Sequence, residues 1–264
     1  MLDRSSIFGQ VMKPDEYFQY HLSEQMELAY SRARQKRAVQ WIVRGNHQKI
    51  LEVGIGIVSL PEIMAENGIR GITLLSVESN SHFVLNQSKK IMNQDLNATV
   101  INKKIEEVTT HDLARFLGGP PDLIVLNSIL HELEDSDSVL RVLMDLANEK
   151  TQLFVNVPNA QSYHNLSREL FGNGKRQRLI LSKNVRHREF TKDRLLSNLE
   201  NFGLYPIYCY TFGYKPVDFY NLELLIEAGK EFLPTLEEMV SFSFHTLPVG
   251  AEIEGVFARK NYSK

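Results

Sequence analysis

Apolar and polar residues follow two different rhythms along this chain. Between residues 15 and 44 apolar positions recur at roughly helical spacing with charges between them, which predicts an amphipathic helix ending at Gly45 and Asn46. Short apolar runs then alternate with helical stretches. The predicted strands are Ile50 to Val53, Ile72 to Val77, Thr99 to Ile101, Leu123 to Leu126 and Gln152 to Val157, and the predicted helices are Leu60 to Glu66, Ser81 to Asn93 and Ser138 to Asn148. This alternation favours a parallel sheet with helices on both faces.

The pattern changes after Pro158. Residues 159–190 are polar and contain a basic run, Lys175, Arg176, Arg178, Lys183, Arg186 and Arg188. The later predicted elements are a helix from Lys192 to Asn201 capped by Thr191, a strand from Leu204 to Phe212, a helical piece around Leu222 to Phe232 and a last strand from Glu252 to Ala258. We expect an α/β domain over residues 48–264, with a helical extension or lid at 1–47 and a cap inserted at about 159–190.

Composition narrows the class of protein. The chain has 264 residues, is 43 % apolar and carries a net charge of -2, which argues against a general polyanion binder. Cys209 is the only cysteine, so an internal disulfide is excluded. Apolar runs stay far below the roughly 18 residues of a membrane span, and the first residues lack a signal-peptide pattern. We therefore expect a soluble cytoplasmic protein without a membrane partner.

A glycine loop follows the first predicted strand. Glu52 is followed by Val53, Gly54, Ile55 and Gly56, and the next strand ends at Glu78. Glycines allow a tight turn and a close approach of a ligand to the backbone, and a carboxylate about 20 residues on can accept hydrogen bonds from a ribose diol. This layout is typical of nucleoside-binding sites.

Two nucleoside cofactors are compatible with that loop. The spacing of Gly54, Gly56 and Ser59 is close to a dinucleotide fingerprint with serine at the third glycine position. An acid at Glu52 would repel a pyrophosphate but attract the ammonium of S-adenosylmethionine. The charge of Glu52 therefore favours S-adenosylmethionine over a nicotinamide dinucleotide.

Four stretches carry a resemblance to a known family. They are Ile50-Leu51-Glu52-Val53-Gly54-Ile55-Gly56, Leu75-Ser76-Val77-Glu78, Asp122-Leu123-Ile124-Val125-Leu126-Asn127-Ser128-Ile129-Leu130-His131-Glu132, and Val157-Pro158-Asn159-Ala160. With His164 and His187 following in order, the segment from about Gln48 to Phe212 resembles the class I S-adenosylmethionine-dependent methyltransferases. It looks most like the branch of the ubiquinone-biosynthesis O-methyltransferases and related small-molecule enzymes.

The resemblance implies a fold and a set of cofactor contacts. It implies a Rossmann-like, doubly wound, seven-stranded sheet whose last strand is antiparallel. Glu52, Gly54 and Gly56 would lie by the methionine part of S-adenosylmethionine, and Glu78, with Ser79 beside it, by the ribose. Lys104 and Ile105 would flank the adenine, while Asn127 and Ser128 would face the methionine end and the substrate.

Val58 departs from the family pattern. The family often has a third small residue two positions after Gly56, and a branched side chain there would crowd the cofactor or shift the start of the helix. This keeps a non-catalytic, S-adenosylmethionine-binding regulatory protein open as an alternative. A nicotinamide-dependent oxidoreductase is a third reading.

Histidines are the candidate bases for methyl transfer to a hydroxyl, because their ordinary pKa lies near neutrality. His131, four residues past Asn127, is the first candidate, with Glu132 or Asp135 to orient it. His164 and His187 are the next two.

The sequence also argues against a metal and against a nucleic-acid partner. We expect no metal, because no dense carboxylate cluster follows the strands. The segment Asn156-Val157-Pro158-Asn159 resembles the motif of DNA amino-methyltransferases, but it lacks the second proline and the stacking aromatic, so we expect no nucleic-acid partner. The sequence favours methyl transfer to a hydroxyl or amine of a small biosynthetic metabolite, and it leaves a homodimer open.

Overall fold

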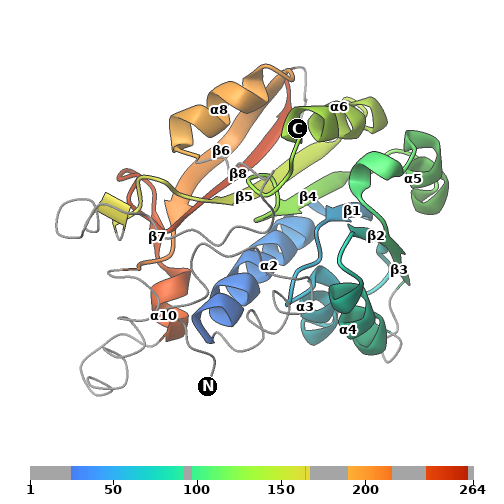
Figure 1. The fold of residues 1–264 in the computed structure, drawn as a ribbon, viewed down its shortest axis with the longest axis horizontal. Helices are drawn as coiled ribbons and strands as arrows, with labels where there is room; N and C mark the ends of the chain where they lie inside the picture. Colours follow the sequence, from blue (N-terminus) through green and yellow to red (C-terminus); the bar gives the residue numbers. More distant parts are fainter. Residues whose placement is uncertain (1–24, 92–96, 164, 167–189, 216–235, 261–264) are drawn as a thin grey trace.

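A mixed sheet with helices on both faces forms the body of the protein (Figure 1). The computed structural model describes residues 25–91, 97–163, 165–166, 190–215 and 236–260. The strands are β1 (Lys49–Val53), β2 (Thr73–Glu78), β3 (Asn97–Asn102), β4 (Leu123–Asn127), β5 (Gln152–Pro158), β6 (Leu204–Phe212), β7 (Ser243–Phe244) and β8 (Glu252–Arg259). The helices are α2 (Gln25–Gly45), α3 (Leu60–Glu66), α4 (Ser81–Ile91), the 3-10 helix η2 (Ile105–Glu107), α5 (Thr110–Leu117), α6 (Ser136–Leu146), α8 (Lys192–Glu200) and α10 (Leu236–Ser241).

The strand order is β3-β2-β1-β4-β5-β8-β6-β7. Strands β1 to β5 pair in parallel, and β8 runs antiparallel between β5 and β6. The predicted doubly wound sheet with an antiparallel last strand is confirmed. The predicted count of seven strands is one too low, because the two-residue β7 adds an edge strand too short to leave a pattern in the sequence.

The elements predicted within the described residues mostly agree with the structure. Helix α3 has the predicted bounds, and the Thr191 side chain caps α8 by accepting a hydrogen bond from the backbone N–H of Arg194. Helix α5 was not predicted, because it is short and buries only Leu113 and Leu117. Helix α10 was not predicted either. The predicted helical segments 15–24 and 222–232 lie outside the described residues.

Two hydrophobic clusters cover the two faces of the sheet. Leu51 and Val53 of β1 point toward the cluster built with α5, α6 and α8, whereas Ile50 points toward the cluster built with α2, α3 and α4. This division follows from the alternation of side chains along a strand. Helix α2, blue in Figure 1, therefore shares one core with the sheet through its last turns.

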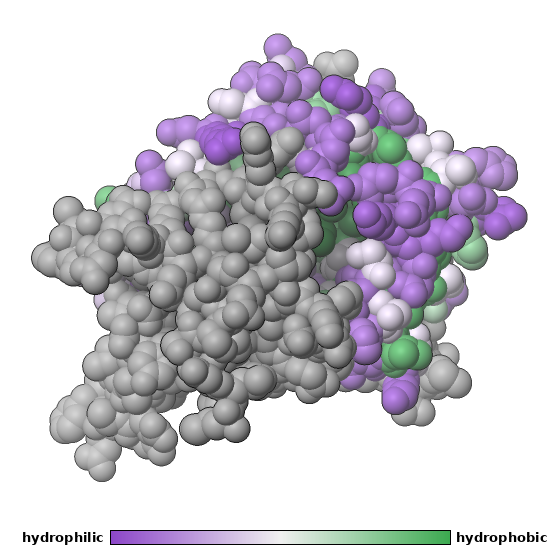
Figure 2. All heavy atoms as spheres, in the orientation of Figure 1, coloured by the Kyte–Doolittle hydropathy of each residue, from purple (hydrophilic) through white to green (hydrophobic). Residues whose placement is uncertain are grey.

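The surface agrees with this layering. On the face shown in Figure 2, hydrophilic residues dominate the outside of the described part, and hydrophobic residues show in smaller patches between them. Among the described helices, none combines the length and the apolar character that crossing a membrane would require.

Candidate functional site

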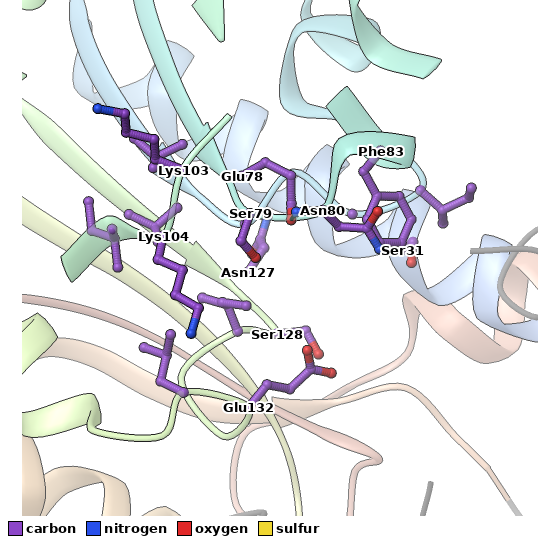
Figure 3. Close-up of a pocket in the computed structure, with 18 of the residues that line it drawn as sticks. Ser31, Glu78, Ser79, Asn80, Phe83, Lys103, Lys104, Asn127, Ser128 and Glu132 are labelled. Atoms are coloured by element: carbon purple, nitrogen blue, oxygen red, sulfur yellow. Dashed lines mark hydrogen bonds between the residues drawn. The ribbon is translucent and has the colours of Figure 1, made fainter. Parts of the chain in front are cut away.

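A cavity of about 590 Å³ lies at the carboxyl ends of β1, β2 and β4. Strand β1 lies between β2 and β4, so the chain order of the strands reverses next to it, and ligands of open α/β sheets bind at such a point. Side chains from the strand-end loops and from α2 converge on the cavity (Figure 3). The lining residues that the sequence analysis named as cofactor contacts are Gly54, Gly56, Glu78, Ser79, Lys104, Ile105, Asn127 and Ser128.

Glu78 holds the turn on which these residues sit. Its Oε2 accepts a hydrogen bond of 2.9 Å from the backbone N–H of Ile55, and its Oε1 accepts one of 2.7 Å from that of Asn80. Burial raises the pKa of Glu78, and these backbone donors oppose that rise. The carboxylate thus joins the loops after β1 and β2 and still lies in the cavity wall.

Backbone conformation shapes the wall beside Glu78. Gly54 and Gly56 have φ of 79° and 65°, in the left-handed region that glycine enters without strain. Ser128 also has a positive φ, of 55°, although it carries a side chain. Backbone strain of this kind in a non-glycine residue concentrates at functional sites, and Ser128 directly follows Asn127 in the cavity wall.

Glu52 lies behind the wall and not in it. Its side chain is 0 % exposed, and its carboxylate accepts hydrogen bonds from Gln35 Nε2, Ser76 Oγ and the backbone N–H of Leu60. Burial raises the pKa of Glu52 to about 7, against the lowering effect of those three donors. The expectation that Glu52 itself faces the cofactor is therefore corrected: the carboxylate is sequestered, because three donors from α2, β2 and α3 surround it.

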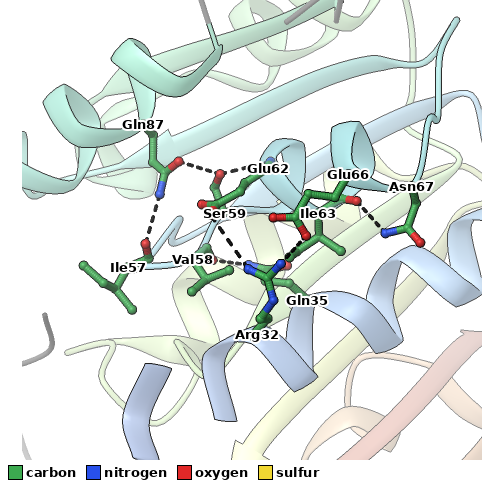
Figure 4. Close-up of polar contacts among 10 residues, drawn as sticks. All are labelled: Arg32, Gln35, Ile57, Val58, Ser59, Glu62, Ile63, Glu66, Asn67 and Gln87. Carbon is green, nitrogen blue, oxygen red and sulfur yellow. Dashed lines mark hydrogen bonds and ion pairs between the residues drawn. The ribbon is translucent and has the colours of Figure 1, made fainter. Parts of the chain in front are cut away.

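Two buried glutamines hold the loop that leads into α3 (Figure 4). Gln35 donates to the carbonyl oxygen of Val58 over 3.2 Å, and Gln87 donates to that of Ile57 over 3.2 Å. Ser59 Oγ donates to Gln87 Oε1 at 2.6 Å. Hydrogen bonds from α2 on one side and from α4 on the other thus hold the loop in place.

Val58 does not have the effects on the cofactor site and on the helix start that the sequence predicts. Its side chain is buried in the hydrophobic cluster under α2 and α3, outside the lining of the cavity. Helix α3 begins at Leu60 as predicted, with Ser59 as its N-cap. Neither crowding of the cavity nor a shifted helix is seen.

Helix α2 supplies a charged wall that the sequence analysis missed. Glu27, Ser31 and Arg34 line the cavity. Arg34 Nη2 lies 2.9 Å from Glu27 Oε1 and 4.0 Å from Glu252 Oε1. Burial opposes the charge of the Arg34 guanidinium, but the two carboxylates outweigh it and raise its pKa. Burial also raises the pKa of Glu252 to about 7, although Arg34 acts against that rise.

The candidate bases lie in different places. His131 lies in the loop after β4, with its Nε2 3.7 Å from Glu132 Oε1, and Glu132 rather than His131 lines the cavity. Asp135, named as a partner for His131, instead caps α6 by accepting from the backbone N–H of Ser138. His164 and His187 lie outside the described residues, as does most of the predicted cap.

Aromatic side chains of β6 make internal contacts in the structure. Tyr208 and Tyr210 donate to Glu254 Oε1 at 3.2 and 2.7 Å, and Phe212 is fully buried.

Within the described ranges, no group of three or more His, Cys, Asp or Glu side chains is placed to hold a metal ion.

Several lining residues and their supports have no motif that would reveal them. Phe83 of α4, Lys103 after β3 and Glu106 of η2 line the cavity. Gln35 supports the wall through Asn127, whose Nδ2 donates to Gln35 Oε1 over 2.8 Å. The helical pattern of residues 15–44 was the one signal for α2, and it did not indicate which turn meets the sheet.

Comparisons with known proteins place the fold. No protein-family model matches the chain, and no curated protein matches it in sequence. A magnesium protoporphyrin IX methyltransferase from Synechocystis PCC 6803 is 11 % identical, with a TM-score of 0.54 over 96 % of this chain and 90 % of that chain. A possible histamine N-methyltransferase from Thermotoga maritima is 13 % identical, with a TM-score of 0.56 over 93 % and 95 %.

A third solved structure agrees with these two. The plantazolicin methyltransferase BamL, in complex with a desmethyl analogue and S-adenosylhomocysteine, is 13 % identical, with a TM-score of 0.54 over 93 % of this chain and 90 % of that chain. The chain therefore has the fold of the class I S-adenosylmethionine-dependent methyltransferases. The resemblance to the ubiquinone-biosynthesis branch stays a prediction.

Proposed function

We propose that the cavity binds S-adenosylmethionine and that the protein transfers its methyl group to a hydroxyl or amine of a small metabolite. The observation that carries this proposal is the position of Glu78. Its carboxylate lies in the cavity wall beside the glycine turn, at the end of the second strand of this fold. A ribose diol can donate two hydrogen bonds to such a carboxylate.

The rest of the cavity suits the same cofactor. Its volume of about 590 Å³ falls in the range of pockets for ligands of this size. Ile105, in the cavity lining, offers an apolar contact for an adenine ring. Asn127 carries a buried Oδ1 with no hydrogen-bond partner among the described residues, which suits the ammonium of the methionine part. When bound, the cofactor supplies the electrophilic methyl group.

The start of α3 argues against a nicotinamide dinucleotide. Such cofactors place a pyrophosphate on free backbone N–H groups at the helix start. Here the N–H of Leu60 donates to Glu52, Pro61 has none, and the N–H of Glu62 donates to Ser59 Oγ. The donors of the first turn are thus already engaged or absent, so a pyrophosphate would find no cradle.

The acceptor is a small molecule in this proposal. The neighbours named above include methyltransferases of magnesium protoporphyrin IX and of plantazolicin. Glu27, Ser31, Arg34 and Glu132 also line the cavity and remain for contacts with an acceptor. His131, in contact with Glu132, is our first candidate base, with His164 and His187 as the others.

Calorimetric titration with S-adenosylmethionine and S-adenosylhomocysteine tests the proposal. We expect both ligands to bind, and we expect Glu78→Ala to weaken binding by about 100-fold, because it removes two hydrogen bonds to a charged acceptor. Glu106→Ala is the matched control, since Glu106 is an exposed carboxylate on the same cavity, and it should change affinity less than about threefold.

Two outcomes would contradict the proposal. The absence of heat and of a thermal shift with either ligand at millimolar concentration would remove the cofactor. Tight binding without turnover across a broad panel of hydroxyl and amine acceptors would favour the non-catalytic regulatory alternative.

A further inference from the structure

Gln35 connects three parts of the molecule that meet behind the cavity. It lies on α2 and is 3 % exposed. Its Nε2 donates to Glu52 Oε1 over 3.1 Å and to the carbonyl oxygen of Val58 over 3.2 Å. Its Oε1 accepts from Asn127 Nδ2 over 2.8 Å. One side chain thus links β1, the loop before α3 and the end of β4.

The partners of Gln35 determine which way each amide points. A backbone carbonyl can only accept, so the Gln35 atom facing Val58 must be the NH₂ group. Its oxygen then faces Asn127, and Asn127 must turn its own NH₂ group toward Gln35. The Asn127 oxygen is left as an acceptor with no partner among the described residues, on a residue that lines the cavity.

The two amides are aligned with the charge of Glu52. The Asn127 nitrogen donates to the Gln35 oxygen, and the Gln35 nitrogen donates to Glu52 Oε1. Both amides thus point their NH₂ groups toward the carboxylate. Hydrogen bonds in such a chain polarise one another, and the low dielectric of the interior strengthens the effect. The Asn127 oxygen is therefore a stronger acceptor than an isolated amide and is suited to a cationic donor.

We propose that Gln35 is a positioning residue through which the sequestered Glu52 acts on the cavity, by holding the Asn127 Oδ1 as the acceptor for the amino group of the methionine part of S-adenosylmethionine. This inference rests on the proposed function. It gives Glu52 an electrostatic effect on the cofactor without direct contact. It also assigns a role to α2 in cofactor binding.

The test compares two ligands that differ by the amino-acid part. S-adenosylhomocysteine carries the amino group, whereas methylthioadenosine keeps the nucleoside and lacks it. Gln35→Met fills the same space without polar atoms. We expect it to weaken S-adenosylhomocysteine at least tenfold in calorimetric titration, because a hydrogen bond to a charged donor is lost, and to change methylthioadenosine less than threefold.

Gln87→Met is the matched control. Gln87 is 0 % exposed and clamps the same loop from α4, through Ile57 and Ser59, on the opposite side from Gln35. A loss of loop order would affect both variants and both ligands. We expect Gln87→Met to leave the ratio of the two affinities unchanged.

The outcomes separate the inference from the proposed function. If the wild type binds neither ligand, the proposed function fails and the inference falls with it. If the wild type binds S-adenosylhomocysteine and Gln35→Met weakens both ligands equally, or neither, the inference alone is wrong. Should Gln35→Met not fold, Asn127→Ala must show the same ligand-selective loss, and an equal effect on the two ligands would overturn the inference.

Discussion

The cavity has two walls of different construction. The strand-end wall consists of the loops after β1, β2, β3 and β4, and backbone groups hold much of it, as where Ile55 and Asn80 donate to Glu78. The α2 wall consists of Glu27, Ser31 and Arg34, and the buried Arg34 pairs with the partly buried Glu27. The strand-end wall follows from the fold, whereas the α2 wall depends on individual side chains. In the proposed function, the first wall binds the cofactor and the second contacts the acceptor.

The largest expected effect is the loss of unfolding free energy when the central charge of the α2 wall is removed. Arg34→Met should lower the free energy of unfolding by about 3–5 kcal/mol, because it removes the cation that pairs with the buried Glu252 and the partly buried Glu27. Urea unfolding measures the loss.

Arg32→Met on the same helix is the control for that prediction. Arg32 is 40 % exposed and pairs with Glu62 and Glu66 at the surface, so its loss should cost less than about 1 kcal/mol. Similar losses for Arg32→Met and Arg34→Met would mean that the α2 wall is not held by its buried charges.

A second expected difference is in the dependence of stability on pH. Burial raises the pKa of both Glu52, behind the strand-end wall, and Glu252, behind the α2 wall, from 4.5 to about 7. A carboxyl that holds its proton more tightly when folded stabilises the protein fully below pH 4.5, and that stability is lost as the pH rises through 7. Each glutamate contributes on the order of 3 kcal/mol to this loss.

Glutamine substitutions separate the contributions of Glu252 and Glu52 to the pH dependence of stability. Glu252→Gln should remove the contribution of Glu252 to the fall of the unfolding free energy between pH 5 and 7, since the amide does not titrate. Urea unfolding at several pH values measures this fall. Glu52→Gln should also cost stability at pH 5, because an amide has one accepting oxygen where both oxygens of the Glu52 carboxyl group accept hydrogen bonds. An unchanged slope in Glu252→Gln would show that Glu252 keeps an ordinary pKa.

The smallest expected effects lie inside the strand-end wall. Gly56→Ala should cost about 1–2 kcal/mol of unfolding free energy through its positive φ alone, because an added Cβ meets no atom within 4 Å. Gly54→Ala should cost more, since its Cβ would lie 3.0 Å from Ile129 Cγ1. Thermal unfolding ranks the two variants, and the reverse order would contradict the close approach at Gly54.

Sequence reasoning was more successful for the strand-end wall than for the α2 wall, for a physical reason. Gly54 and Gly56 lie in the loop after β1, and Glu78 ends β2. Parallel strands bring their carboxyl ends to the same edge of the sheet, independently of how the helices pack. The partners of Arg34 come from distant parts of the chain, and no local pattern tells that this turn of α2 meets Glu252.

Glu52 shows how a correct chemical argument can assign the wrong contact. Its charge favoured a cationic cofactor, but the sequence does not reveal that Gln35 and Ser76 enclose the carboxylate. The side chain that relays its effect lies on a helix whose packing is decided by tertiary contacts. The roles of His131, His164 and His187 stay predictions.

The shared core under α2 limits how the cavity can open. Ala38, Val39 and Ile42 are at most 4 % exposed and pack with the sheet. Swinging this helix outward like a door would expose Val39 and Ile42 to water at about 1.5–3 kcal/mol each, besides breaking the contacts of Gln35. Helix α2 is therefore a fixed border of the cavity, and access to the cavity depends on other segments that border it.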